Sequence, residues 1–178
     1  MLVIAATERE LAGLGLAAGN LMVCGVGPIE AAAATGRALA ERRPRAVLHV
    51  GLAGARGFVA PELVLGSEAV YCDTDSPLVP ARALPDAALL EAARTALPHA
   101  RTCAIGTSAR VGGTTGVEVE AMEGFAVLRA CERAGVPALE VRALSNEIDE
   151  PDRGRWRFDE ALEVLQEAVP VLLEALGE

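Results

Sequence analysis

The stretch Val117–Asn146, VEVEAMEGFAVLRACERAGVPALEVRALSN, contains the pattern on which the predicted fold rests. It begins with a short apolar segment that turns into a helical pattern, Met122–Ala134. Gly135, followed by a proline two residues later, is typical of a helix end. The apolar run Ala138–Leu144 comes next and has the length of a buried strand. A helix that leads directly into a buried strand is the repeating unit of an α/β domain.

The rest of the chain alternates in the same way. Short apolar runs between Gly, Pro or charged residues predict further strands at Leu2–Ala6, Leu21–Val26, Ala46–Val50, Ser67–Cys72 and Thr102–Ile105. Helical patterns occupy Pro28–Arg42, Pro85–Leu97 and Phe158–Leu176. The last of these carries one apolar stripe, and Pro170 should bend it. We therefore predict an α/β fold, a single domain over residues 1–178, in three α/β/α layers with a mixed, largely parallel central sheet.

The composition excludes several classes of function. The net charge of −9 argues against a broad basic face for nucleic acid. All 16 basic residues are arginines, which excludes mechanisms that need a Schiff-base or P-loop lysine. No apolar run approaches the roughly 20 residues of a membrane helix, and the apolar N-terminus lacks the basic segment of a signal peptide. We therefore expect a cytoplasmic protein with no membrane or nucleic-acid partner.

The cysteines and histidines give little support for a metal site. The cysteines are widely spaced in apolar runs, at Cys24, Cys72, Cys103 and Cys131. This distribution favours buried free thiols over metal ligands. His49 and His99 lie far apart, with no cluster of acidic residues or cysteines beside either. We expect neither a metal ion nor another cofactor.

Two glycine-containing segments each have more than one interpretation. Cys24–Glu30, CGVGPIE, has the first two glycines of a dinucleotide-binding loop, but a glutamate replaces the third and a proline intrudes. A tight turn from strand to helix is therefore favoured. His49–Ala55, HVGLAGA, is a strand that runs into a turn of small residues. Such a turn could let a ligand approach the backbone at Ala53 and Gly54, or it could serve packing alone.

Charged residues are concentrated in the stretch quoted at the start. Glu118, Glu120 and Glu123 surround its junction between strand and helix, and Glu123 follows Met122 at a position where burial is expected. A buried carboxylate needs hydrogen-bond donors. The helix dipole would stabilise it, and a ribose diol would supply two hydroxyls. Arg142, within the next strand, is expected to pair with a buried carboxylate rather than to bind substrate.

Four motifs in one order across nearly the whole chain carry a resemblance to a known family. They are Ala6–Glu10, Val50–Gly54, Val119–Gly124 and Val141–Asn146. In these motifs the chain resembles the nucleoside phosphorylase and nucleosidase superfamily, in particular its hydrolase branch. The resemblance implies cleavage of the N-glycosidic bond of a small-molecule purine nucleoside, and a homodimer as the smallest active unit.

The resemblance also implies roles for particular residues. Glu10 matches the glutamate that orients and deprotonates the attacking water, and Met122 and Glu123 match the residues beneath the ribose. Ser145 and Asn146 match a Ser-Asp pair whose aspartate protonates N7 of the purine in adenosine-type nucleosidases. Further substrate-binding residues on this interpretation are Ala53, Gly54, Arg110 and Val111. Because bond cleavage builds positive charge on the ribose and negative charge on the base, it needs these carboxylates and a donor at N7.

Two departures from the family refine the predicted reaction. His49 and Leu52 stand where phosphorolytic members hold phosphate, so hydrolysis is favoured over phosphorolysis. Asn146 stands in place of the aspartate, and an amide cannot be a general acid, although it can donate one hydrogen bond and accept another. A 6-oxopurine presents N7 and O6 as adjacent acceptors, whereas adenine presents an acceptor beside a donor. Asparagine therefore suits hypoxanthine as the leaving base.

This amide and the trailing segment Asp149–Trp156 resemble the futalosine hydrolases of menaquinone biosynthesis, which release hypoxanthine and leave dehypoxanthine futalosine. Futalosine carries a carboxyphenyl ketone on its 5′ side, and its carboxylate would need an arginine or backbone donors. Arg110, Arg153 and Arg155 are candidates, although Arg153 could equally cap the last helix or form a surface ion pair.

Two alternatives stay open. The first is a methylthioadenosine/S-adenosylhomocysteine-type nucleosidase, which carries out the same chemistry on an adenine nucleoside. The second is a relative that binds nucleosides without turning them over. The presence of both Glu10 and Glu123 argues against the second alternative, because a binding module has no need of a base that activates water.

Overall fold

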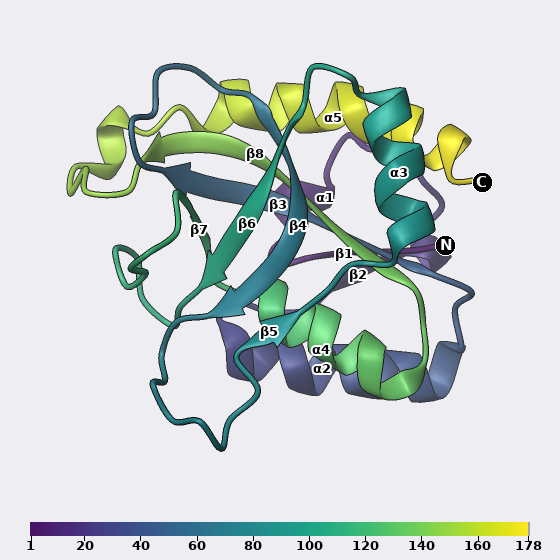
Figure 1. The fold of residues 1–178 in the computed structure, drawn as a ribbon. Coiled ribbons are helices and arrows are strands. Elements are labelled where there is room, and N and C mark those ends of the chain that lie inside the picture. Colours follow the sequence, from purple (N-terminus) through teal and green to yellow (C-terminus); the bar gives the residue numbers. More distant parts are fainter. Residues whose placement is uncertain (178) are drawn as a thin grey trace.

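The protein, described here from a computed structural model over residues 1–177, is a mixed β-sheet between two groups of helices (Figure 1). Helices α2 (Pro28–Arg42) and α4 (Gly124–Ala134) pack against each other on one side of the sheet. Helices α3 (Ala87–Ala96) and α5 (Phe158–Ala175) cover the other side. The predicted class, three α/β/α layers around a mixed sheet, is confirmed.

Eight strands form the sheet: β1 Leu2–Ala5, β2 Leu21–Val23, β3 Val47–Ala55, β4 Leu63–Tyr71, β5 Arg82–Ala83, β6 Arg101–Thr107, β7 Val119–Ala121 and β8 Ala138–Glu147. Strands β2, β1, β3 and β8 are parallel neighbours, and β4, β6 and β7 form a second parallel group. The antiparallel pairs β8–β4 and β7–β3 join the two groups. The sheet therefore closes on itself through β3, β8, β4, β6 and β7, with β1 and β2 as a parallel extension.

Strand β3 is longer than the sequence pattern suggested. The small residues Gly51–Gly54, expected to form a turn, continue the strand to Ala55. The backbone of β3 pairs with β8 from Val47 to Ala55, with an irregularity between Ala53 and Gly54. This continuous ladder compensates for the weak strand preference of glycine. Strand β8 likewise runs on to Glu147, so the polar residues at its end belong to the sheet.

The helices follow the sequence pattern more closely. Helix α2 has the predicted bounds because Pro28 occupies its first turn and Arg43 ends it in the left-handed conformation, with φ 47°. Gly135, with φ 68°, ends α4. Helix α5 continues past Pro170 to Ala175, and its stripe of Leu165, Val169 and Leu172 is buried as predicted. The sequence pattern did not predict three short helical elements: α1 (Glu8–Leu11) and the 3₁₀ turns Ala18–Asn20 and Arg153–Arg155.

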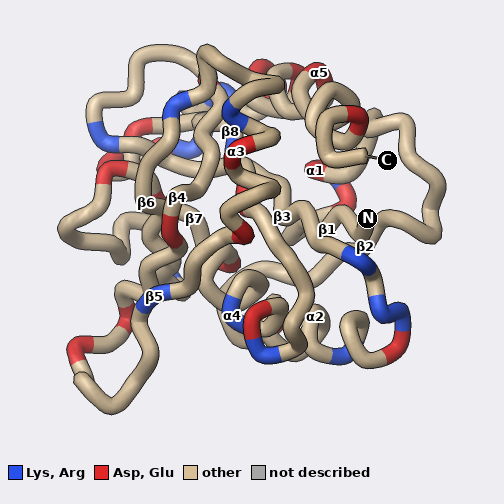
Figure 2. Tube along the Cα trace, turned by 45° about the vertical axis from the view of Figure 1, so that its right-hand side comes forward, with Lys and Arg blue, Asp and Glu red and all other residues tan. Residues whose placement is uncertain are grey.

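Charged residues of both signs are interspersed along the chain (Figure 2). Many form local ion pairs on helices, such as Arg37 with Glu41 at 2.9 Å and Arg129 with Glu132 at 2.6 Å. Among the described residues, no helix combines the length and apolarity that crossing a membrane requires.

The four cysteines are free thiols. Cys24 and Cys131 are buried, as expected, and burial raises the pKa of each to about 12, so both stay protonated at neutral pH. Cys72 and Cys103 are half-buried, which departs from the expectation that all four would be buried. Within residues 1–177, no group of three or more His, Cys, Asp or Glu side chains is placed to hold a metal ion.

Candidate active site

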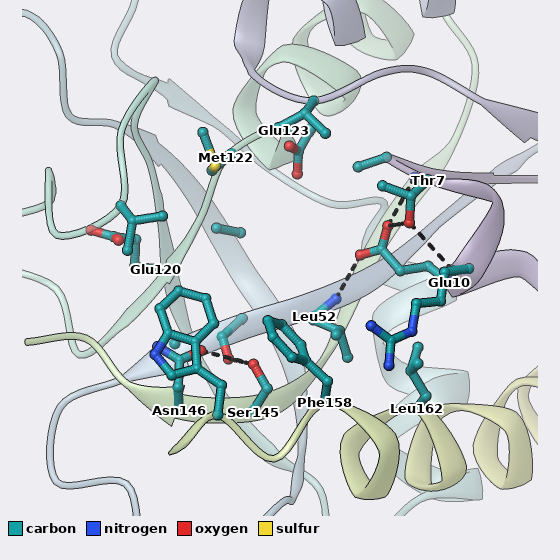
Figure 3. A pocket seen from close by; sticks show the side chains of 18 residues that line it. Thr7, Glu10, Leu52, Glu120, Met122, Glu123, Ser145, Asn146, Phe158 and Leu162 are labelled. Atoms are coloured by element: carbon teal, nitrogen blue, oxygen red, sulfur yellow. Dashed lines mark hydrogen bonds between the residues drawn. The ribbon is translucent and has the colours of Figure 1, made fainter. Parts of the chain in front are cut away.

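A cavity of about 280 Å³ opens at the carboxyl ends of β1, β3 and β8 (Figure 3). Its wall comes from seven segments: the turn after β1 with α1, the turn after β2, the end of β3, the loop after β6, the junction from β7 to α4, the end of β8, and Trp156 with the start of α5. The volume is near the lower end of the roughly 300–1,000 Å³ usual for small-molecule sites. Segments from the whole length of the chain thus meet in one pocket.

Glu10 is held in one orientation by three donors. Its Oε2 accepts hydrogen bonds from the Thr7 backbone N–H at 2.9 Å and the Thr7 hydroxyl at 2.8 Å. Its Oε1 accepts one from the Leu52 N–H on β3 at 3.0 Å. Thr7 and Glu10 form a capping box at the start of α1, which explains the local fold. A carboxylate has about four acceptor positions, so Glu10 can still accept a bond from a water in the cavity.

Glu123 lies on the same side of the cavity as Glu10 (Figure 3). It precedes α4, but its side chain does not cap that helix. Instead its Oε1 accepts a hydrogen bond from the Gly27 N–H at 3.0 Å, in the turn from β2 to α2. Burial raises the pKa of Glu123, the Arg142 charge and the Gly27 bond lower it, and the Glu10 charge raises it. The glycine turn predicted from Cys24–Glu30 therefore serves this carboxylate.

Arg142 lies beneath the two carboxylates and is fully buried. Its Nε donates to Glu140 Oε1 at 2.9 Å, and its Nη2 lies 3.6 Å from Glu123 Oε2. The prediction that Arg142 pairs with a buried carboxylate is confirmed. Gly51 makes room for this arrangement, since a Cβ there would lie 2.2 Å from Arg142 Nη1 and 2.6 Å from Glu10 Oε1.

Asn146 lies across the cavity from the two carboxylates, beside Ser145 (Figure 3). The Ser145 hydroxyl donates to Asn146 Oδ1 at 2.8 Å, and Asn146 Nδ2 donates to the Glu147 carbonyl at 2.9 Å. A carbonyl oxygen only accepts, so this contact identifies the Nδ2 side of the amide. One N–H of Nδ2 then stays available to a bound molecule.

The other residues predicted for the site lie around the same cavity, with one exception. Met122, Ala53, Gly54 and Val111 all contribute to the wall. Arg110 is exposed and does not line the cavity, because the loop after β6 directs only its neighbour Val111 toward it. The structure therefore gives no support to Arg110 as a binding residue.

Glu120, which the sequence placed at the junction between strand and helix without a role in the site, also lines the cavity. It is buried in the cavity wall, and it accepts hydrogen bonds from the Thr114 N–H at 2.8 Å and the Thr114 hydroxyl at 2.7 Å. A third bond comes from the Gly112 N–H at 2.5 Å. Glu120 thus fastens the loop that carries Val111. The sequence could not predict these contacts, because no known motif spaces a glutamate in this way from a preceding glycine-rich loop.

Arg9, Trp156, Phe158 and Leu162 form the remaining side of the cavity. The Arg9 guanidinium lies 5.5 Å from the centre of the Phe158 ring and forms an ion pair with Asp159 at 2.6 Å. Phe158 and Leu162 fit the apolar stripe of α5, so periodicity alone assigned them to the core. The sequence signals for this side of the site were the adjacency of Arg9 to Glu10 and the family resemblance of the segment that ends at Trp156.

Comparisons with known proteins agree with this geometry. The family model of the phosphorylase superfamily matches residues 20–177. A futalosine hydrolase of Streptomyces coelicolor is 36% identical over 190 residues, covering 88% of this chain and 79% of that protein. A futalosine hydrolase of Thermus thermophilus is 47% identical over 62 residues, covering 35% of this chain and 28% of that protein.

Solved structures share the fold. A futalosine hydrolase mutant of Helicobacter pylori has a TM-score of 0.86 at 14% identity, covering 97% of each chain. The 5′-methylthioadenosine/S-adenosylhomocysteine nucleosidase of Neisseria meningitidis, in complex with methylthio-immucillin-A, has a TM-score of 0.81 at 24% identity, covering 98% of this chain and 96% of that one. The resemblance first indicated by four short motifs is confirmed, and the chain belongs to the phosphorylase superfamily.

Proposed function

We propose that the protein hydrolyses the N-glycosidic bond of a purine nucleoside, and that its substrate is futalosine, which yields hypoxanthine and dehypoxanthine futalosine. One observation carries the proposal: two oriented carboxylates, Glu10 and Glu123, face one side of the cavity and an amide, Asn146, faces the other. The identity to a futalosine hydrolase over most of the chain supports the choice of substrate.

At the ribose, the two carboxylates have different tasks. Glu123 accepts hydrogen bonds from the ribose hydroxyls, and its negative charge stabilises the positive charge that grows on the sugar. Glu10 accepts a proton from water as the oxygen attacks the anomeric carbon. The bond to the base breaks and the electron pair leaves with the purine, whose anion then takes up a proton from solvent while Glu10 gives its own proton back to solvent. The capping-box geometry supports this role, because it orients Glu10 while leaving one acceptor position open.

At the base, Asn146 stabilises the leaving purine without giving up a proton. Its Oδ1 is occupied by Ser145, so the remaining Nδ2–H is the group that can donate to N7. A hydrogen bond of this kind strengthens as negative charge develops on the ring. The adjacent acceptors N7 and O6 of hypoxanthine can share this Nδ2–H, whereas adenine presents its N6 donor beside N7, so the contact favours hypoxanthine.

The nucleophile on this proposal is water rather than phosphate. His49, where phosphorolytic relatives hold the anion, is fully buried beneath the site. Burial, with the Arg142 charge beside it, holds the pKa of His49 well below its usual range, so the ring is neutral. Leu52 offers no charge at the second position. Neither side chain can bind phosphate.

Arg9 replaces the earlier candidates for the carboxylate on the 5′ side of futalosine. It lines the cavity beside two aromatic rings that could pack against a phenyl group. Arg153 instead lies over the Trp156 ring, with 5.5 Å from its guanidinium carbon to the ring centre, and Arg155 pairs with Glu150 at 2.7 Å. The ion pair between Arg9 and Asp159 is exposed, and such pairs are weak enough for a ligand carboxylate to compete.

A methylthioadenosine/S-adenosylhomocysteine-type nucleosidase is the second candidate, since a solved structure of that kind shares the fold over nearly the whole chain. The deciding experiment incubates the protein with futalosine, inosine and methylthioadenosine, each with and without phosphate, and follows free base by chromatography. Hypoxanthine release from futalosine without phosphate is expected. A requirement for phosphate would refute hydrolysis, adenine release alone would refute futalosine as substrate, and no release would favour a nucleoside-binding relative.

The remaining expectations extend this proposal. We place the enzyme in the cytoplasm, as one domain over residues 1–178 that acts as a homodimer. The family resemblance supports the dimer. Light scattering on the purified chain tests it, and a monomer that turns over futalosine would contradict it.

A further inference from the structure

Glu140 is a buried carboxylate that the reaction described above does not use. It lies near the start of β8, is fully buried and does not line the cavity. Its Oε1 accepts the hydrogen bond from Arg142 Nε at 2.9 Å, and its Oε2 has no hydrogen-bond partner in residues 1–177. A Cβ on Gly124 would lie 2.2 Å from both carboxylate oxygens. The carboxylate therefore fills the space between Arg142 and the first residue of α4.

The guanidinium of Arg142 is oriented by hydrogen bonds on two sides. Glu140 binds Nε, and the ring nitrogen Nε2 of His49 lies 2.5 Å from Nη2. The Nδ1 of His49 lies 3.0 Å from the Ile4 carbonyl, which can only accept, so Nδ1 carries the hydrogen and Nε2 accepts from Arg142. These two contacts aim Nη2 at Glu123 and bring Nη1 beside Glu10.

Stability alone does not account for this arrangement. Replacing a buried ion pair by apolar residues is often neutral or stabilising, so a fold does not need one for its own sake. Glu123 already lies beside Arg142 as an opposite charge. A second carboxylate, buried with one unpaired oxygen, adds a cost of burial that packing does not explain.

We propose that Glu140 is a positioning residue that acts on the site through Arg142. Its carboxylate, held under the first turn of α4, keeps the guanidinium facing Glu123 and Glu10 and takes up part of its charge. The inference rests on the proposed role of Glu123 beneath the ribose. His49 supports the same guanidinium from the opposite side as a neutral acceptor.

The charge shared between Glu140 and Glu123 links this role to pH. Burial raises the pKa of Glu140, and Arg142 lowers the pKa of Glu140 and of Glu123 alike. When Glu140 loses its charge, Arg142 acts more strongly on Glu123 and lowers the pKa of Glu123 further. The titratable and charged groups that face these two carboxylates are Glu10, Cys24, His49, Cys103 and Arg142.

A double-mutant cycle tests the contact. Gly124 does not adopt a left-handed backbone conformation, and the three atoms nearest to a Cβ added there all belong to the Glu140 carboxylate, so Gly124→Ala presses directly on that group. We expect kcat for base release to fall about 100-fold, the loss that a misplacement of about 1 Å can cause. In a Glu140→Ala background, the same Gly124→Ala substitution should lower kcat by no more than about twofold. Gly36→Ala, in open space on α2, is the matched control and should leave kcat unchanged. Equal losses in both backgrounds would overturn the proposal.

Glu140→Gln tests the charge. The amide keeps the volume and an acceptor for Arg142 Nε, so the acidic limb of the pH–rate profile should move to lower pH by about one unit. An unmoved limb would contradict the shared charge.

A readout without substrate separates this inference from the proposed function. The buried Nε–H of Arg142 should give a slowly exchanging ¹⁵N NMR signal that shifts in both Gly124→Ala and Glu140→Gln. If the wild type releases no base but the signal shifts, the proposed function fails and the contact stands. If the wild type is active and the signal stays in place in both variants, the positioning role of Glu140 fails.

Discussion

The two ends of the cavity are built in different ways. At the end where we propose that the ribose binds (the ribose end), Glu10 and Glu123 are buried, and the donors that hold them come from Thr7 before α1, from β3 and from the turn before α2. At the end where we propose that the 5′ substituent binds (the 5′ end), Arg9 is exposed, and its partner Asp159 is more exposed still. Reacting groups need a fixed geometry, which a buried scaffold provides, whereas recognition of a substituent tolerates exposed side chains. Substitutions at the ribose end should therefore lower kcat, and substitutions at the 5′ end should raise KM.

The largest effect is expected from Glu10→Gln. Glutamine can still form the capping box, so the fold should be kept while the base is lost. We expect kcat to fall about 1,000-fold, within the range of a general base, measured as hypoxanthine released from futalosine. Glu8→Gln, at an exposed position in the same turn, is the control. Activity near that of the wild type would refute the role of Glu10.

Asn146→Asp probes the base side of the buried end. An aspartate can protonate N7 but lacks the amide N–H that suits a 6-oxopurine. The ratio of kcat/KM for futalosine to that for methylthioadenosine should fall about tenfold to 100-fold. Asn20→Asp, on the surface, should leave the ratio unchanged. An unchanged ratio would contradict the proposal that Asn146 sets the preference for hypoxanthine over adenine.

Arg9→Ala tests the exposed end. KM for futalosine should rise about tenfold with kcat nearly constant, since one charge-assisted contact is lost. Inosine, which has no carboxylate, should be cleaved as before. Arg37→Ala, on the exposed face of α2 in an ion pair with Glu41, is the control, because neither residue lines the cavity. A loss in kcat for both substrates would mean that the two ends are not independent.

The smallest effect is a displacement of the pH–rate profile. Burial raises the pKa of Glu123, and the proposed mechanism needs its carboxylate form. Activity is therefore lost as the pH falls through this raised pKa, and the acidic limb should lie above about 4.3, the ordinary value for glutamate. The rate of hypoxanthine release from futalosine, measured from about pH 4 to about pH 8, gives the position of this limb. A limb below the ordinary value would contradict the burial of the reacting form.

The fold followed from local signals, and the site only in part. The bounds of α2 were readable because Pro28 has a direct backbone consequence at a helix start. Strand β3 was underestimated because the partner strand that stabilises its glycines lies about 90 residues away in the sequence. Short elements such as β7 and α1 carry too few residues to show a period.

The site residues divide along the same line. Glu10 could be assigned only through the family resemblance, because a threonine and a glutamate three positions apart also describe an ordinary capping box. Arg9 was missed in favour of Arg110, since only the tertiary fold brings the start of α5 back to α1. Arg142 was interpreted correctly because a charge inside a buried strand must find a partner wherever it lies.

Gly51 has a consequence for how this protein can vary. The space that a single methyl group would need is already taken by Arg142 Nη1 at 2.2 Å and Glu10 Oε1 at 2.6 Å. A mutational library aimed at the side chains of the cavity would pass over this position, since glycine has none and does not line the wall. Yet one added carbon there would press on both the Arg142 guanidinium, which Glu140 holds, and the Glu10 carboxylate, which Thr7 and Leu52 hold. The absence of a Cβ at position 51 therefore limits which substitutions this enzyme can accept.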